Sequence, residues 1–291
     1  MGRRVLTIPV GAVWAIFLVV AVEIVVTYAR LPPSQLYHVS GTGVAAGLGR
    51  ALVFLNFPVA LAALPLAVLV ADRSRDDRLA FALAIVAAGL CAVVFWPGVV
   101  DQANLDAKAI NALPAAGVVL TAALAARAGL FALPAHVDVV LGVVLAALLV
   151  LASPWFCADL GLFLDRVPLL GSVFLTGKVV DGHPAVHHGH HHGMDGLLLV
   201  IAALATIPAL RRAQNSTLAA FVTLYLGLEI TYGLANIAND AWYEQVVKRG
   251  WTSVTIPSVL RPTVSLAWLG IVLATPLFAA LVHRRAAARP V

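Results

Sequence analysis

Six of the nine histidines in this 291-residue chain lie within ten residues, in the segment DGHPAVHHGHHHGMD. Neutral imidazole is a frequent side-chain ligand of transition metals and binds Zn, Cu, Ni and Fe. The segment therefore predicts contact with a transition-metal ion, whose identity these ligands do not specify. An acid at the end of the segment would complete or orient the site. The predicted metal-binding residues are His183, His187, His188, His190, His191, His192 and Asp195.

Two local structures are compatible with this segment. In a helix, His183 and His187 would stand four residues apart on one face, as two ligands of one ion do. Gly189 and Gly193 favour an irregular loop instead, which would bind metals loosely and with little selectivity. A third interpretation is a histidine-rich loop of biased composition without a specific role.

Motifs of well-known enzyme families are absent from the sequence. The runs HPAVHH and HHGHHH resemble the histidine boxes of membrane di-iron hydroxylases and desaturases, which place several boxes along the chain. The other histidines here, His38, His136 and His283, do not form such boxes. No Walker loop, dinucleotide fingerprint, G-x-S-x-G elbow or H-E-x-x-H zinc motif occurs either.

The composition places the histidine segment in an integral membrane protein. The chain is 62% hydrophobic and 11% charged, whereas a soluble domain is roughly 25% charged. A bilayer core needs about 20 apolar residues per helix, so we expect an all-α, polytopic helical bundle forming one domain over residues 1–291. About eight transmembrane helices are expected, at 6–29, 45–71, 79–97, 109–126, 137–157, 195–210, 217–236 and 263–282.

Eight spans would place both termini on one side of the membrane. Lysine and arginine are more numerous on that side, which the positive-inside rule assigns to the cytoplasm. We therefore expect a multi-pass protein of the cell membrane with cytoplasmic termini and an extracytoplasmic histidine-rich loop. The net charge of +5 is then a topology signal and does not predict nucleic-acid binding. The long extracytoplasmic loops would be 98–108, 158–194 and 237–262.

The loop 158–194 contains an apolar stretch, GLFLDRVPLLGSVFLTG at 161–177. Its length and its Pro and Gly residues are compatible with an interfacial or re-entrant helix as well as with a loop. A complete ninth span is disfavoured, because it would move Arg211 and Arg212 to the outer face.

A polar stripe occupies the seventh expected span. Its members stand at offsets of 0, 3, 7, 10 and 11 residues, which places them on one face of a helix. Ionisable residues inside a membrane usually face a bundle interior or a wet cavity. The stripe therefore predicts an internal polar pocket open to the outer face, with a structural polar network as the alternative. Its members are Glu229, Tyr232, Asn236, Asn239 and Asp240.

Three functions are compatible with these features. The first is handling or transport of a transition metal. The second is a membrane-embedded, metal-dependent enzyme acting on a lipid or an extracytoplasmic substrate, with Glu229 or Asp240 as the catalytic base. The third is an accessory subunit that docks a protein partner through its outer loops. The expected partners are thus the lipid bilayer and a metal ion, with a protein partner under the third function and no nucleic acid.

Overall fold

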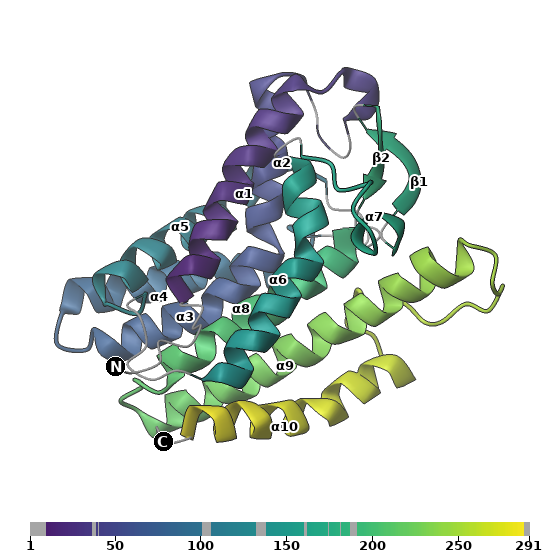
Figure 1. Ribbon diagram of the computed structural model, residues 1–291. Coiled ribbons are helices and arrows are strands. Elements are labelled where there is room, and N and C mark those ends of the chain that lie inside the picture. Colours follow the sequence, from purple (N-terminus) through teal and green to yellow (C-terminus); the bar gives the residue numbers. More distant parts are fainter. Residues whose placement is uncertain are drawn as a thin grey trace, which may run out of the picture.

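The computed structural model describes residues 10–36, 39, 41–100, 106–131, 138–159, 162–173, 175–180, 182–186 and 191–287. It is a bundle of helices with one β-hairpin at one end (Figure 1). The long helices are α1 Val10–Arg30, α2 Val44–Asn56, α3 Pro58–Arg73, α4 Arg78–Ala92, α5 Ala112–Arg127, α6 Val139–Asp159, α8 His191–Leu210, α9 Ser216–Ala241 and α10 Leu266–Ala287. The short elements are η1 Pro33–Gln35, η2 Val93–Phe95, η3 Ala109–Asn111, α7 Leu170–Val173, β1 Leu175–Val180, β2 His183–Val186 and the π-helical η4 Trp242–Val247.

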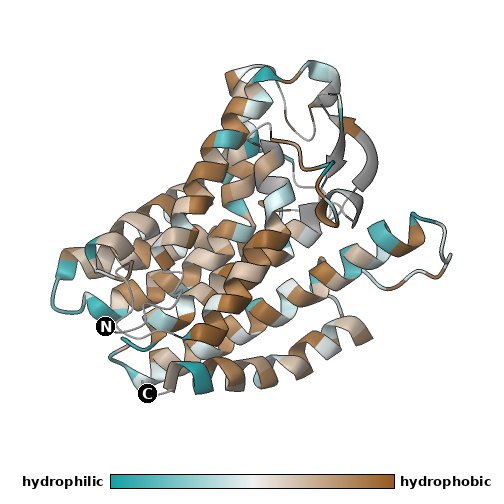
Figure 2. Ribbon diagram, in the orientation of Figure 1, coloured by the Kyte–Doolittle hydropathy of each residue, from teal (hydrophilic) through white to brown (hydrophobic). Residues whose placement is uncertain are grey.

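Every segment expected to cross the membrane coincides with a helix or with a bent pair of helices. By length and composition, six helices within the described residues are able to cross a membrane, and α2 with α3 forms a seventh, broken span. The apolar part of α6, Val139–Pro154, is shorter. The helices carry mostly hydrophobic residues, while hydrophilic residues gather near their ends (Figure 2). The protein is therefore a multi-pass helical bundle compatible with contact to a lipid bilayer.

The second span breaks where α2 meets α3, with a bend of 49°. Pro58 is the first residue of α3 and crowds the preceding residue. Phe57 stays in the right-handed helical region with distorted dihedrals, a φ of −97° and a ψ of −72°. Further along α3, Pro65 has no N–H and so leaves the carbonyl of Leu61 without its intrahelical donor. Both prolines therefore disturb the part of the helix pair that faces α9.

Helix α8 lies at the centre of the bundle. Of its span Gly193–Leu210, 89% is buried, and it packs against α9, α3, α6, α1 and α10. Its closest approach is to α9, where a Cβ added to Gly196 would stand 2.5 Å from the Gly233 carbonyl oxygen. Small residues let membrane helices approach this closely. The interface between α8 and α9 is thus tightly packed, and the polar stripe lies on its α9 side.

Ion pairs join several loops at one end of the bundle. Asp138 lies 3.2 Å from the Arg285 guanidinium and 3.7 Å from that of Arg211, and Asp77 lies 3.1 Å from Arg127. The beginning of α1 also lies at this end (Figure 1). The loops on the side assigned to the termini therefore gather together, as the expected topology requires. Which side of a membrane this end faces stays a prediction.

The opposite end contains parts of two of the predicted loops. In the first, β1 and β2 form an antiparallel hairpin, in which Val180 pairs with His183 and Gly182 adopts a φ of 78°. Of the expected interfacial or re-entrant helix at 161–177, the described residues contain only α7. In the predicted loop 237–262, α9 and η4 continue the helix to Val247, and Gly250, whose φ is 75°, follows it.

Candidate functional site

The polar stripe on α9 faces the bundle interior, as its spacing predicts. Glu229, Tyr232, Asn236 and Asp240 are all buried. Asn239 is partly exposed and donates a hydrogen bond of 2.9 Å to the carbonyl oxygen of Pro257. The interior of the stripe divides into an Asp240 region beside the start of α8 and a Glu229 region at the middle of α9.

The Asp240 region contains two buried carboxylates from neighbouring helices. A Cβ at Gly193, in the first turn of α8, would overlap the Asp240 side chain, so the helices meet directly there. Asp195, two residues along α8, is 8% exposed. The guanidinium of Arg50 on α2, also buried, lies within electrostatic range of Asp195. An acidic and a basic side chain are thus both buried in the bundle, Asp195 on α8 and Arg50 on α2.

Asp195 Oδ2 and Asn236 Oδ1 are buried acceptor atoms that have no hydrogen-bond donor among the described residues. The Asn236 amide nitrogen instead donates to the carbonyl oxygen of Tyr232, at 2.9 Å. Buried polar atoms usually bind a protein group, water or an ion. These two oxygen atoms are therefore available to accept a hydrogen bond from water or to coordinate a cation.

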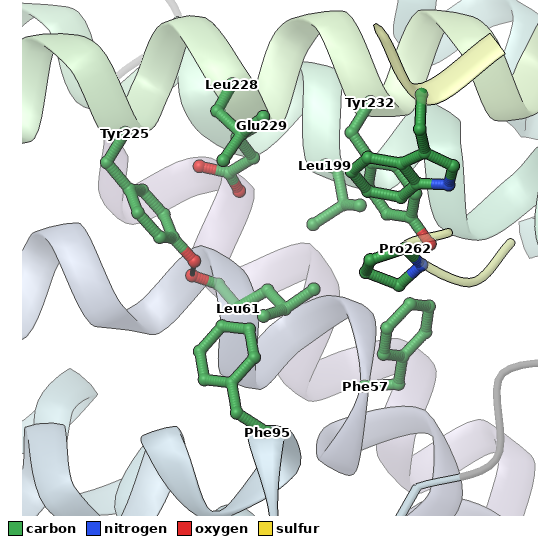
Figure 3. Close-up of a pocket in the computed structure, with 10 residues that line it drawn as sticks. Phe57, Leu61, Phe95, Leu199, Tyr225, Leu228, Glu229, Tyr232 and Pro262 are labelled. Carbon is green, nitrogen blue, oxygen red and sulfur yellow. Dashed lines mark hydrogen bonds between the residues drawn. The ribbon is translucent and has the colours of Figure 1, made fainter. Parts of the chain in front are cut away.

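The Glu229 carboxyl group points into a cavity of about 200 Å³ between α9 and α3 (Figure 3). Apart from this carboxyl group and the hydroxyls of Tyr225 and Tyr232, the side chains of the wall are hydrophobic or aromatic. The sequence predicted a polar pocket, and the structure has a largely apolar one. The other lining residues are Phe57, Leu61, Phe95, Leu199, Leu228, Pro262 and Trp268.

Both tyrosine hydroxyls of the cavity donate to backbone carbonyls. Tyr232 Oη lies 2.9 Å from the carbonyl oxygen of Leu260. Tyr225 Oη lies 3.0 Å from the carbonyl oxygen of Leu61 (Figure 3). The Leu61 carbonyl is the one that Pro65 deprives of its intrahelical donor. A side chain of a neighbouring helix thus satisfies a backbone group that proline left free, as membrane interiors require. Neither hydroxyl proton is directed at Glu229.

Replacing Tyr225 with phenylalanine should lower the free energy of unfolding by about 1–3 kcal/mol, because it leaves the buried Leu61 carbonyl without a donor. In a Pro65→Ala background the helix supplies its own N–H to that carbonyl, so the same replacement should cost much less. A denaturant titration of the four proteins in detergent measures the difference. Equal costs of Tyr225→Phe in both backgrounds would contradict this account of the hydroxyl.

The two predicted catalytic residues do not share one site. Glu229 and Asp240 are eleven residues apart on a continuous helix, which separates them by roughly 16 Å along its axis at about 1.5 Å per residue. A pair acting on one substrate must lie within hydrogen-bond reach of the same reacting group. Any roles in catalysis would therefore belong to different steps or to different substrates.

The histidines are placed only in part by the described residues. His183 begins β2, so the helical pairing of His183 with His187 is wrong. His187, His188 and His190 lie outside the described residues, and His191 and His192 are described only as the backbone that begins α8. No group of three or more His, Cys, Asp or Glu side chains able to hold a metal ion occurs within the described ranges.

The environment of His183 is compatible with a metal ligand. Its ring stacks on Phe163, with centroids 4.1 Å apart, and its Nδ1 lies 3.6 Å from Asp165 Oδ1. A carboxylate beside one ring nitrogen commonly orients a histidine whose other nitrogen binds a metal. This arrangement leaves Nε2 as the nitrogen for an ion.

Sequence reasoning missed most residues that surround the stripe. The aromatic residues Phe57, Phe95 and Trp268 come from the junction of α2 and α3, from η2 and from α10. One signal in the sequence could have been used. Pro65 has no N–H, so the carbonyl of Leu61, four residues before it, needs another donor, and Tyr225 supplies it. The remaining neighbours depend on which helices pack together, which periodicity within one helix does not specify.

Comparisons of the chain with models of known protein families, with curated proteins and with solved structures found no match.

Proposed function

We propose that this multi-pass membrane protein handles or transports a transition-metal ion at the end of the bundle that carries the histidine segment. The observation that carries the proposal is the position of that segment. It leads directly into α8, whose first turn lies against Asp240. An ion captured by imidazoles would therefore stand next to the buried carboxylates of the α8–α9 interface.

The chemistry of the neighbouring groups supports this proposal. Imidazole suits Zn, Cu, Ni and Fe, and Asp165 would orient His183 for binding. Asp240 lies against the first turn of α8, which the histidines precede, and Arg50 lies within electrostatic range of Asp195. We therefore assign capture to the histidines, and a role in receiving the ion to Asp240. The proposed side for capture is the extracytoplasmic one.

A metal-dependent membrane enzyme is the second candidate, and the cavity beside Glu229 favours it. Its apolar walls suit a lipid-like substrate, and its one carboxylate would serve as a general base. The histidine site would then supply the metal. Metal uptake by the protein in sealed liposomes separates the two functions, because an enzyme would bind the ion without moving it.

Replacing all six clustered histidines with alanine should remove metal binding. The purified protein, loaded with Zn²⁺, Cu²⁺ or Ni²⁺ and freed of excess ion, should retain at least one equivalent, which the six-fold variant should lose. Elemental analysis measures the ratio of metal to protein. A matched control replaces His38, His136 and His283, which lie outside the segment, and should keep the bound ion.

Two results would overturn the proposal of metal handling. One is full metal retention by the six-fold variant. The other is an equal loss in the control variant, which would show that binding follows total histidine content and not this segment. Thermal unfolding of all three proteins establishes that each is folded when the metal is measured.

A further inference from the structure

We propose that the Glu229 cavity is a binding site for a small apolar amine, whose ammonium group donates hydrogen bonds to the Glu229 carboxylate. This site is separate from the metal site proposed above. Its wall contains no histidine among the described residues, and it lies about three helical turns from Asp240. The proposal therefore stands or fails independently of metal binding.

The Glu229 carboxylate is buried without a hydrogen-bond donor. The residue is 5% exposed, and neither Oε1 nor Oε2 has a partner among the described residues. Both neighbouring hydroxyls, of Tyr225 and Tyr232, donate elsewhere. A buried charge is expensive unless it is paired and hydrogen-bonded. A ligand that brings a positive charge and N–H donors would supply what the protein does not.

The cavity wall is suited to the cation as well as to the apolar part of such a ligand. Five of its ten lining residues are aromatic: Phe57, Phe95, Tyr225, Tyr232 and Trp268. Aromatic faces attract ammonium groups, and such cages recognise amines elsewhere in biology. The leucines of the wall, Leu61, Leu199 and Leu228, offer dispersion contacts to a hydrocarbon part.

The size of the cavity limits the ligand. A dry cavity of about 150 Å³ is known to bind benzene, so the roughly 200 Å³ here accommodates one ring with a short aminoalkyl arm. Phe95, which is 65% exposed, lies at the mouth of the cavity. A ligand dissolved in the apolar surroundings of the bundle therefore has access to Glu229 beside η2.

2-Phenylethylamine tests the proposal, with 2-phenylethanol as a neutral analogue of the same size. Calorimetry of the detergent-purified chain at neutral pH gives both affinities. The amine should bind at least about tenfold more tightly, because a hydrogen bond to a charged group contributes this much. In Glu229→Gln the ratio should fall close to one. Glu23→Gln, which changes a partly exposed glutamate on α1 outside the cavity, should keep the wild-type ratio.

A second variant tests the location of the site without changing its charge. Leu199→Phe adds volume inside the cavity and should weaken binding of the amine and the alcohol together. A wild-type protein that binds the alcohol as tightly as the amine would overturn the proposal. So would an unchanged preference in Glu229→Gln, or undiminished binding of both probes to Leu199→Phe. Retention of bound metal by Glu229→Gln shows that the metal site is a different one.

Discussion

Replacing Gly233 with alanine should destabilise the bundle by about 1–3 kcal/mol, the usual cost of forcing an extra methyl group into a packed interior. A Cβ at Gly233 would stand 2.6 Å from the Gly196 carbonyl oxygen and 2.8 Å from a methyl group of Val200. The obstacle is the backbone of α8, which cannot rotate away as a flexible side chain can. Helices α8 and α9 must therefore separate, and valine at the same position should prevent folding.

A matched glycine exists on another membrane helix. Gly270 on α10 has open space where a Cβ would be placed, and Gly270→Ala should leave the stability unchanged or raise it slightly, because alanine is the better helix former. Thermal unfolding and size-exclusion profiles in detergent compare the two variants. Equal stability of Gly233→Ala and Gly270→Ala would show that the α8–α9 contact does not limit the fold.

The membrane-spanning pattern was predictable from the sequence because it depends on local composition. Apolar stretches of about 20 residues can satisfy their backbone groups in a bilayer only as helices, and the observed helices coincide with those stretches. The break between α2 and α3 was not part of this expectation, which treated 45–71 as one span, although Pro58 stands directly after it. The phase of the polar stripe on α9 followed from the helical repeat alone.

The end of α9 was not predictable from hydropathy, because the apolar sequence stops before the helix does. Its polar residues find partners in the segment that follows. Trp242 Nε1 donates to the Val254 carbonyl oxygen at 2.9 Å, and Tyr243 Oη donates to that of Ile256. These hydrogen bonds hold the segment that follows against η4. The helix itself was expected within 239–253, with Gly250 as its C-cap, and Gly250 adopts a φ of 75°.

The character of the candidate site was the least predictable part. Glu229, Tyr232, Asn236 and Asp240 correctly indicated an interior face, but the residues opposite them decide whether the interior is polar. Near Asp240 the first turn of α8 packs directly on the carboxylate, and near Glu229 the wall is aromatic and aliphatic. One stripe therefore faces two environments, which a single helix cannot reveal.

Removing the charge of Arg50 should destabilise the chain by about 3–5 kcal/mol, because it leaves a buried carboxylate without its counter-charge. Arg50 is 7% exposed and Asp195 is 8% exposed, so water screens neither group strongly. The isosteric change Asp195→Asn in an Arg50→Met background should recover most of the loss, since a neutral pair carries no buried charge. Denaturant titrations of the wild type, both single variants and the double variant give the coupling free energy.

An exposed arginine on α9's extension supplies the comparison for this cycle. Arg249 hydrogen-bonds Gln245 at the surface, and Arg249→Met should change the stability by less than about 1 kcal/mol. A coupling free energy near zero between Arg50 and Asp195 would show that the guanidinium is balanced by another group. A large coupling would instead identify this pair as the charge balance of the Asp240 region. It would also explain how a carboxylate is kept inside the bundle on α8, the helix that follows the proposed metal-binding histidines.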